Sequence, residues 1–340
     1  MSQTEGSKDK NQLNDKNYQF IEKINIKDFK ITHKINKCNY GYIVLCKKNK
    51  TNQIYSLKIL KKSKLLENKF VERQYNEYKN LSLIYHPFII ELKGINHTDP
   101  YNLYYLYELV PGGSLKNYLK IYKVFPLNYA KFYAASLITI LDFIHKKNII
   151  HRDIRLDSII LNYNGYIKLS EFTFSKYLKN DNLTYSLCGQ PEYYAPEMIN
   201  KTGYNKSIDF WQLGILLYEM LVGYTPFTDS DPVTICQKIN KGKIHFPKKI
   251  DKNAKLIIKH FLNINIYKRL GCSKRGIYEI IEHPFFKDFD WESLLHRKLE
   301  PPFIPNHKLE EFNNYKFLIE NINEDNESLP KDKDPFYNWD

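Results

Sequence analysis

The sequence predicts an α+β protein of two lobes, a small β-rich lobe with one key helix and a large α-helical lobe. Three observations support this fold class. Short apolar runs between turn residues fill residues 29–60 and 89–109, which is the pattern of β-strands. Apolar residues at three- and four-residue spacing dominate after residue 130, which is typical of helices. Pro111-Gly112-Gly113 separates the two patterns and is interpreted as a hinge.

Composition is that of a globular protein. The 340 residues give room for one two-lobed domain or two ordinary domains, and 43% of them are hydrophobic. The five cysteines are scattered without a C-x-x-C pair, which favours a reducing compartment over a disulfide framework or a zinc site.

The net charge of +13 does not by itself predict a nucleic-acid partner. The lysines are spread along the chain, and no basic stripe interleaved with aromatic residues accompanies them. No apolar run is long enough to span a membrane, and no signal peptide is evident. We therefore expect a cytoplasmic protein, and entry into the nucleus is a further option.

The small lobe should contain five strands and one helix. A helix is predicted after the third strand, because Phe70, Tyr78 and Leu81 are spaced so that they would share one side of it. Glu77 falls on the adjoining face of this helix, and Lys58 lies at the end of the third strand. The strands are expected at residues 29–35, 40–47, 54–59, 89–96 and 103–109.

The large lobe should contain two long helices with a hairpin between them. The first helix ends near residue 147, and the second covers residues 208–222 with Ser207 as its N-cap. The hairpin pairs residues 159–161 with 166–169 across a turn that contains Asn and Gly. Because Asp153 precedes it and Glu171 follows it, the hairpin can hold two carboxylates close together at the mouth of a cleft.

These residues stand in motifs that resemble those of protein kinases. His151-Arg152-Asp153 is similar to the H-R-D catalytic loop, and Glu171-Phe172-Thr173 to the D-F-G metal loop. Lys58 in Y-S-L-K-I-L is similar to the strand lysine of V-A-I-K, and Ala195-Pro196-Glu197 matches the A-P-E segment. The resemblance covers about residues 29 to 286. It implies the bilobal protein-kinase fold, with ATP as the phosphoryl donor and Mg²⁺ as the metal.

The resemblance also implies a role for each matching residue. Asp153 would be the catalytic base, and Arg155 stands where a lysine touches the transferred phosphate. Ser158 and Glu171 would be the metal ligands. Three further residues would be structural, with Glu197 paired to Arg269 and Asp209 steadying the catalytic loop. The residues expected to bind ATP are Ile35, Gly41, Ile43, Ser56, Lys58, Glu77, Glu108 and Ile160.

The phosphate and metal side of this site departs from the family pattern. In the phosphate loop, residues 36–43, Gly41 alone remains of three glycines, and Cys38 places a side chain where backbone N–H groups approach phosphate. Ser158 replaces an asparagine and Glu171 an aspartate, in a site that requires near-octahedral geometry at about 2.1 Å. We therefore expect weakened Mg²⁺ binding and a phosphoryl transfer that is weak or lost, as in a pseudokinase. The alternative is a fully active kinase of the cyclic-nucleotide-dependent type that uses Glu171 as a substitute metal ligand.

The C-terminal half resembles the AGC serine/threonine kinases, and among them the cyclic-nucleotide-dependent catalytic chains. The segments L-C-G-Q-P-E-Y-Y-A-P-E and P-F-F-K-D-F-D-W carry this resemblance. Phe336 and Trp339 would dock on the small lobe as the end of an AGC-type C-terminal tail. Expected partners are ATP and a protein substrate or docking partner, with a regulatory subunit as a further candidate. The expected regions are an N-terminal tail (1–28), a small lobe (29–110), a large lobe (111–286) and a C-terminal extension (287–340).

The activation segment resembles one that is switched by phosphorylation. Ser186 occupies the position of the activating phosphothreonine, and Arg152, Lys176 and Arg73 match the cations that receive the phosphate. The alternative is an ordinary loop serine near solvated cations.

The resemblance also suggests how a substrate would be recognised. Asp157 and Glu219 match acidic positions that face a substrate arginine, whereas Ser114 replaces a further acid. We therefore expect a weaker preference for arginine than in the relatives.

Overall fold

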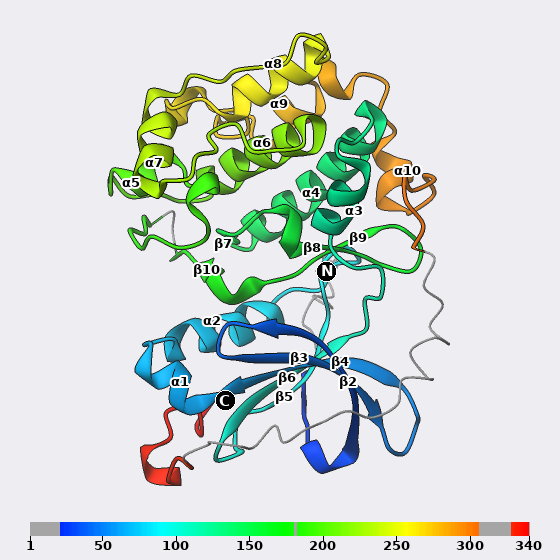
Figure 1. Ribbon diagram of the computed structural model, residues 1–340, viewed down its shortest axis with the longest axis vertical. Helices are drawn as coiled ribbons and strands as arrows, with labels where there is room; N and C mark the ends of the chain where they lie inside the picture. The colour runs from blue at the N-terminus through cyan, green and yellow to red at the C-terminus, as the bar shows by residue number, and fades with distance from the viewer. Residues whose placement is uncertain (1–20, 180–181, 306–327, 340) are drawn as a thin grey trace, which may run out of the picture.

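Two lobes lie one above the other along the long axis of the molecule (Figure 1). The computed structural model describes residues 21–179, 182–305 and 328–339. The small lobe combines a six-stranded sheet with helices, and the large lobe is mostly helical. The predicted α+β class is therefore confirmed.

The small-lobe sheet is antiparallel except at one edge, where β1 runs parallel to β5. The strand order across the sheet is β1-β5-β6-β4-β3-β2. Helices α1 (Lys62–Glu67) and α2 (Val71–Ser82) follow β4. The strands are β1 (Glu22–Lys23), β2 (Phe29–Cys38), β3 (Gly41–Lys48), β4 (Ile54–Lys61), β5 (Leu92–Asn96) and β6 (Asn102–Glu108).

Two features of the small lobe differ from the sequence prediction. Residues 21–28, which the sequence places in an N-terminal tail, contribute β1, and Ile24 is buried against the sheet. Strand β2 runs three residues beyond the predicted end, because Asn36, Lys37 and Cys38 pair with β3. The predicted loop thereby shrinks to a tight turn at residues 39 and 40.

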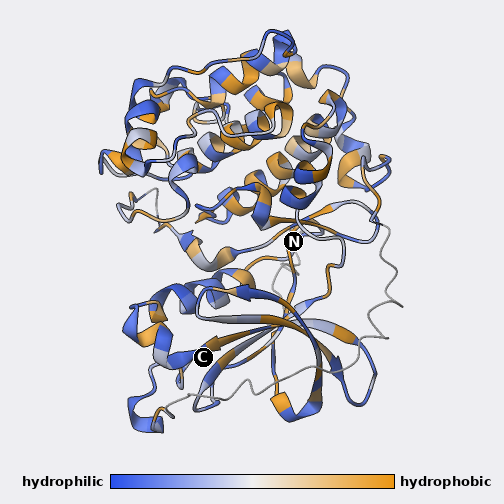
Figure 2. Ribbon diagram, viewed as in Figure 1, coloured by the Kyte–Doolittle hydropathy of each residue, from blue (hydrophilic) through white to orange (hydrophobic). Residues whose placement is uncertain are grey.

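The large lobe is built around helix α6 (Ser207–Val222), which is buried along nearly its whole length. Ser207 is the first residue of the helix and not its N-cap as predicted, because the N-cap position falls at Lys206. The Ser207 N–H donates a hydrogen bond to Asn205 Oδ1 at 3.1 Å. Figure 2 shows hydrophobic residues gathered on the helices inside this lobe. The other helices are α3 (Leu115–Tyr122), α4 (Leu127–Lys146), α5 (Pro196–Ile199), α7 (Pro232–Lys241), α8 (Lys252–Phe261), α9 (Ile277–Ile281) and α10 (Trp291–Leu295).

Short strands line the junction between the lobes. β8 (Ile159–Leu161) pairs with β9 (Ile167–Leu169) as the predicted hairpin, and β7 (Ile149–Ile150) pairs with β10 (Lys176–Tyr177). The hinge is bonded to β8, since the Gly112 N–H donates to Leu161 O at 2.9 Å. A side chain at position 112 would meet that same oxygen at 2.5 Å, so this close approach requires glycine.

One apolar cluster continues from the small lobe into the large lobe. Leu81 of α2 and Leu92 of β5 belong to it from the small lobe, and Phe172 belongs to it from the large lobe. The Phe172 ring lies edge-on to His151 with centroids 4.7 Å apart. This continuous packing fixes α2 relative to the residues that follow β9.

The C-terminal segment 328–339 lies against the small lobe (Figure 1). Phe336 is fully buried, and the Trp339 ring stacks on Tyr78 of α2 with centroids 6.3 Å apart. Lys62 and Asp334 form an ion pair of 2.5 Å that is almost completely buried. Among the described residues, no helix is both long and apolar enough to cross a membrane.

Candidate active site

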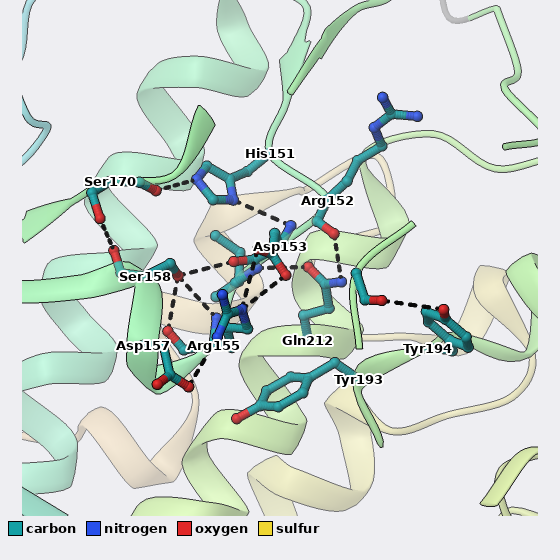
Figure 3. Close-up of polar contacts among 12 residues, drawn as sticks. His151, Arg152, Asp153, Arg155, Asp157, Ser158, Ser170, Tyr193, Tyr194 and Gln212 are labelled. Atoms are coloured by element: carbon teal, nitrogen blue, oxygen red, sulfur yellow. Dashed lines mark hydrogen bonds and ion pairs between the residues drawn. The ribbon is translucent and has the colours of Figure 1, made fainter. Parts of the chain in front are cut away.

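The loop that carries Asp153 is held in place by side chains of α6. The Asp209 carboxylate accepts hydrogen bonds from the backbone N–H groups of His151 at 3.0 Å and Arg152 at 2.8 Å. Gln212, one turn further along the helix, accepts from the Ile154 N–H and donates to Arg152 O (Figure 3). Asp209 thus bonds to the loop that contains Asp153. Gln212 was not foreseen, although its three-residue spacing from Asp209 is a signal that could have found it.

Asp153 is a buried carboxylate with a perturbed charge. Burial raises the pKa of Asp153 to about 6, and the neighbouring Arg155 guanidinium limits the rise. Arg155 Nε lies 3.1 Å and 3.2 Å from the two carboxylate oxygens of Asp153 (Figure 3). At neutral pH the carboxylate is therefore mostly ionised and is able to accept a proton, as a general base must.

Ser158 is fully buried beneath the loop. Its hydroxyl lies 2.9 Å from Asp153 O and 2.8 Å from Arg155 O, and it accepts a hydrogen bond from the Arg155 N–H at 3.2 Å. Figure 3 shows these contacts closing the loop on itself. Because its oxygen is engaged by the loop, the side chain acts as a brace and is poorly placed to be the metal ligand expected from the motif.

Lys58 and Glu77 form a buried ion pair, with Lys58 Nζ 2.9 Å from Glu77 Oε1. Burial opposes the charge of Lys58, but the carboxylates of Glu77 and Glu171 outweigh it and raise the pKa of Lys58. The Thr173 hydroxyl donates to Glu77 at 2.8 Å and accepts from Lys58 at 3.2 Å. The Tyr107 hydroxyl donates to Glu77 at 2.9 Å. Four side chains from β4, α2, β6 and the segment after β9 are thus joined in one network.

Glu171 adopts a left-handed backbone conformation, with φ 61° and ψ 51°. This conformation is uncommon for a residue with a side chain and costs about 1–3 kcal/mol. Within the described residues, no hydrogen bond or ion pair engages its carboxylate, yet its charge affects both Lys58 and Asp153. The carboxylate is therefore available to a cation at the centre of the site.

The donor set fits magnesium only in part. Glu171 supplies a hard carboxylate oxygen, which Mg²⁺ prefers, but the Ser158 oxygen is engaged in the loop. The described parts of the chain contain no group of three His, Cys, Asp or Glu side chains that could hold a metal ion.

The side chains expected around a nucleotide come from both lobes. Ile43, Ser56 and Ile160 are half-buried, and Ile35 of β2 is 48% exposed. The Glu108 side chain instead lies 2.6 Å from Lys168 of β9. Its carboxylate thus joins the end of β6 to the hairpin.

Gly41 has a structural reason to be glycine. A Cβ at this position would lie 1.8 Å from the carbonyl oxygen of Ile59 in the adjacent strand. The one glycine that remains in this loop is therefore required by the sheet itself. Cys38 lies beside the site, where burial raises the pKa of its thiol and the charge of Lys58 opposes the rise.

A model of the protein kinase domain matches residues 29–286. The chain belongs to the protein kinase family. The match covers both lobes from β2 to the 3₁₀ turn at Pro284–Phe286.

Curated relatives are catalytic subunits of cAMP-dependent protein kinases, which are AGC kinases. The chain is 37% identical over 284 residues to the "cAMP-dependent protein kinase catalytic subunit" of Arthrobotrys oligospora, covering 83% of this chain and 54% of that protein. It is 39% identical over 280 residues to the subunit of the same name from Dictyostelium discoideum, covering 82% and 43%. It is 37% identical over 280 residues to the human "cAMP-dependent protein kinase catalytic subunit PRKX", covering 82% and 77%. The chain thus spans about half the length of the first two relatives.

The segment that carries Ser186 is bonded to the loop that carries Asp153. Arg152 Nη1 donates to Ser186 Oγ at 2.8 Å, and Ser186 is exposed. Lys176 Nζ donates to Thr184 Oγ1 at 3.1 Å. The guanidinium of Arg73 lies 4.4 Å from the centre of the Phe70 ring and 5.2 Å from the centre of the ring of Phe174, which shortly precedes Lys176. Of the three expected cations, Arg152 and Lys176 thus donate hydrogen bonds to hydroxyl groups of this segment.

Glu197 and Arg269 form a bidentate ion pair, with contacts of 2.5 Å and 2.9 Å. Both side chains are buried, so the pair ties the A-P-E segment to the segment after α8.

The two acids expected to face a substrate arginine are both engaged by the chain itself. Asp157 pairs with Arg155 Nη1 at 2.9 Å. Glu219 is buried, pairs with Lys116 Nζ at 2.5 Å, and accepts a hydrogen bond from the Tyr193 hydroxyl. Sequence reasoning missed Lys116, because nothing in the local pattern around α3 indicates a partner 103 residues away.

Proposed function

We propose that this chain is an AGC-type serine/threonine protein kinase-like protein whose phosphoryl transfer from ATP is weak or lost. The observation that carries this proposal is the engagement of the Ser158 hydroxyl within the catalytic loop. The residue that should provide a magnesium ligand instead holds the loop together. The remaining framework, with Lys58, Glu77 and Asp153, suits nucleotide and substrate binding.

The residues divide into those that bind and those that react. Lys58, held by Glu77, would pair with the nucleotide phosphates. Asp153 would accept the proton of a serine or threonine hydroxyl as that oxygen attacks the terminal phosphate of ATP, and ADP would leave with the electron pair of the broken P–O bond. Bound magnesium would neutralise charge on the phosphates, and Glu171 is the residue able to hold it. Arg155 would stabilise the ionised Asp153 while contacting phosphate less flexibly than a lysine does.

A second candidate is a fully active kinase. The free carboxylate of Glu171, close enough to affect both Lys58 and Asp153, favours it. In this case Glu171 would serve as the substitute metal ligand, and Ser158 would have no part in metal binding.

Phosphate transfer from ATP to a library of serine and threonine peptides separates the two candidates. We expect little transfer by the natural protein, none by Asp153→Asn, and more by the double variant Ser158→Asn with Glu171→Asp. The two repairs act on one metal cluster, so their effects should be non-additive. Turnover of about 1 per second or faster by the natural protein, an ordinary rate for kinases, would favour the fully active enzyme.

The proposal extends to regulation and partners. The buried side chains of Phe336 and Trp339 support docking of the C-terminal tail on α2. The large lobe would bind a cytoplasmic protein substrate or docking partner, and a regulatory subunit is a further candidate. Phosphorylation of Ser186 would add charge-assisted hydrogen bonds to Arg152 and order the activation segment. Limited proteolysis tests this switch, since a phosphorylated protein should be cleaved more slowly than Ser186→Ala between residues 176 and 190.

A further inference from the structure

Glu219 is a buried acid whose two oxygens are both occupied. It lies on α6 with 2% of its side chain exposed, and its oxygens contact Lys116 Nζ at 2.5 Å and the Tyr193 hydroxyl. Lys116 lies in the first turn of α3, and 35% of its side chain is exposed. The cation therefore stands between solvent and the buried carboxylate.

This position of Lys116 decides what else Glu219 can bind. A buried carboxylate is costly without a cation, and here the chain supplies that cation itself. An incoming basic side chain would have to displace Lys116 before it gained the same contact. The exchange replaces one ion pair by another, so little net affinity remains for the incoming group.

The other two positions expected to recognise a basic peptide, Asp157 and Ser114, offer no free carboxylate in place of Glu219. The Asp157 carboxylate pairs with Arg155 at 2.9 Å, and Arg155 also contacts Asp153 (Figure 3). Ser114, at the N-cap of α3, carries no charge. Cations of the chain thus neutralise both acids that would otherwise attract a basic peptide.

We propose that Lys116 is a specificity-determining residue that occupies Glu219 in place of a peptide's basic side chain. The protein accordingly binds peptides that are neutral at the position facing Glu219 as well as it binds peptides with arginine there. This inference rests on the proposed kinase-like function, and it assigns the class of peptide that the site accepts.

The test compares two fluorescent serine peptides by anisotropy, one with two arginines before the serine and one with glutamines in their place. The natural protein should bind them with dissociation constants within about twofold of each other. Lys116→Met should bind the arginine peptide about tenfold more tightly than the glutamine peptide, because Glu219 is then free to pair with arginine. Lys116→Arg, which keeps the cation, and Lys120→Met, one turn along on the exposed side, should behave as the natural protein does.

The unfolding temperature and a second variant distinguish this role of Lys116 from a purely structural one. Lys116→Met should unfold at a lower temperature, and the arginine peptide should restore that temperature while the glutamine peptide does not. The Glu219→Gln variant should bind the arginine peptide with a dissociation constant within about twofold of that of the natural protein. This second result does not depend on the folding of Lys116→Met.

Two results would overturn the inference. One is a natural protein that already prefers the arginine peptide by about tenfold and loses the preference in Glu219→Gln. The other is a folded Lys116→Met that gains no preference for arginine, including the case in which neither protein binds either peptide. These measurements use no nucleotide and no turnover, so a failure of the proposed kinase-like function would show in phosphate transfer instead.

Discussion

Replacing Asp153 by asparagine should stabilise the folded protein at neutral pH. Folding buries this carboxylate and raises its pKa from 3.8 to about 6. The folded state therefore holds the proton more tightly than the unfolded state does. The stability that this group contributes is fully present below about pH 4 and is lost as the pH rises through about 6. Asparagine stays neutral and loses nothing over that range.

The size of the effect follows from the pKa shift. A rise from 3.8 to about 6 is about two pKa units, and at about 1.4 kcal/mol per unit it amounts to about 3 kcal/mol. Only 6% of the Asp153 side chain is exposed, so solvent screening reduces this figure little. Asp153→Asn should thus gain about 2–3 kcal/mol of unfolding free energy at pH 7.5 and nothing near pH 4.

Urea denaturation of both proteins at several pH values between 4 and 8 measures the difference. Asp157→Asn is the matched control, because its side chain is 47% exposed and its pair with Arg155 should contribute less than about 1 kcal/mol. A variant that is less stable than the natural protein at pH 7.5 would refute the reasoning. So would a gap in stability that stays the same from pH 4 to pH 8.

Two further predictions concern buried contacts of the small lobe. Asp334→Ala should remove the carboxylate from Lys62, whose Nζ keeps its hydrogen bond to His97 O at 2.6 Å. The change should cost about 3–5 kcal/mol or release the C-terminal segment, and a protease should then cleave that segment faster. Replacing the exposed Asp332 by alanine should have neither effect. Thr173→Val should lower the unfolding free energy by about 1–3 kcal/mol, because the Lys58–Glu77 pair loses a bridging hydroxyl; a variant as stable as the natural protein in the same urea assay would mean that the bridge contributes nothing.

The parts of the fold that follow local patterns could be predicted from the sequence. The helix with Glu77 shows the spacing of an amphipathic helix, and the hairpin between Asp153 and Glu171 has a turn rich in Asn and Gly. The tight turn after β2 could not be found in this way. It depends on Cys38 pairing with Gly41 across the strands, whereas the motif match suggested a more open loop.

The motif match indicates which residues belong to the candidate site, but it does not indicate how their side chains are hydrogen-bonded. The sequence locates Ser158, yet only the folded loop shows that its hydroxyl is engaged by backbone groups. Lys62 pairs with Asp334 across 272 residues, and no periodicity relates positions so far apart. Such contacts depend on packing between elements, which local sequence does not encode.

Titration of ATP in a calorimeter, with magnesium and then with a chelator, tests the central claim most directly. If Lys58 and Glu77 hold the nucleotide while the metal side is impaired, the two dissociation constants should agree within about threefold. Lys58→Met should abolish binding under both conditions, which would assign the measured heat to this site. Binding that appears only with magnesium, or tightens by about a hundredfold with it, would contradict the account and show that Glu171 completes a working metal site.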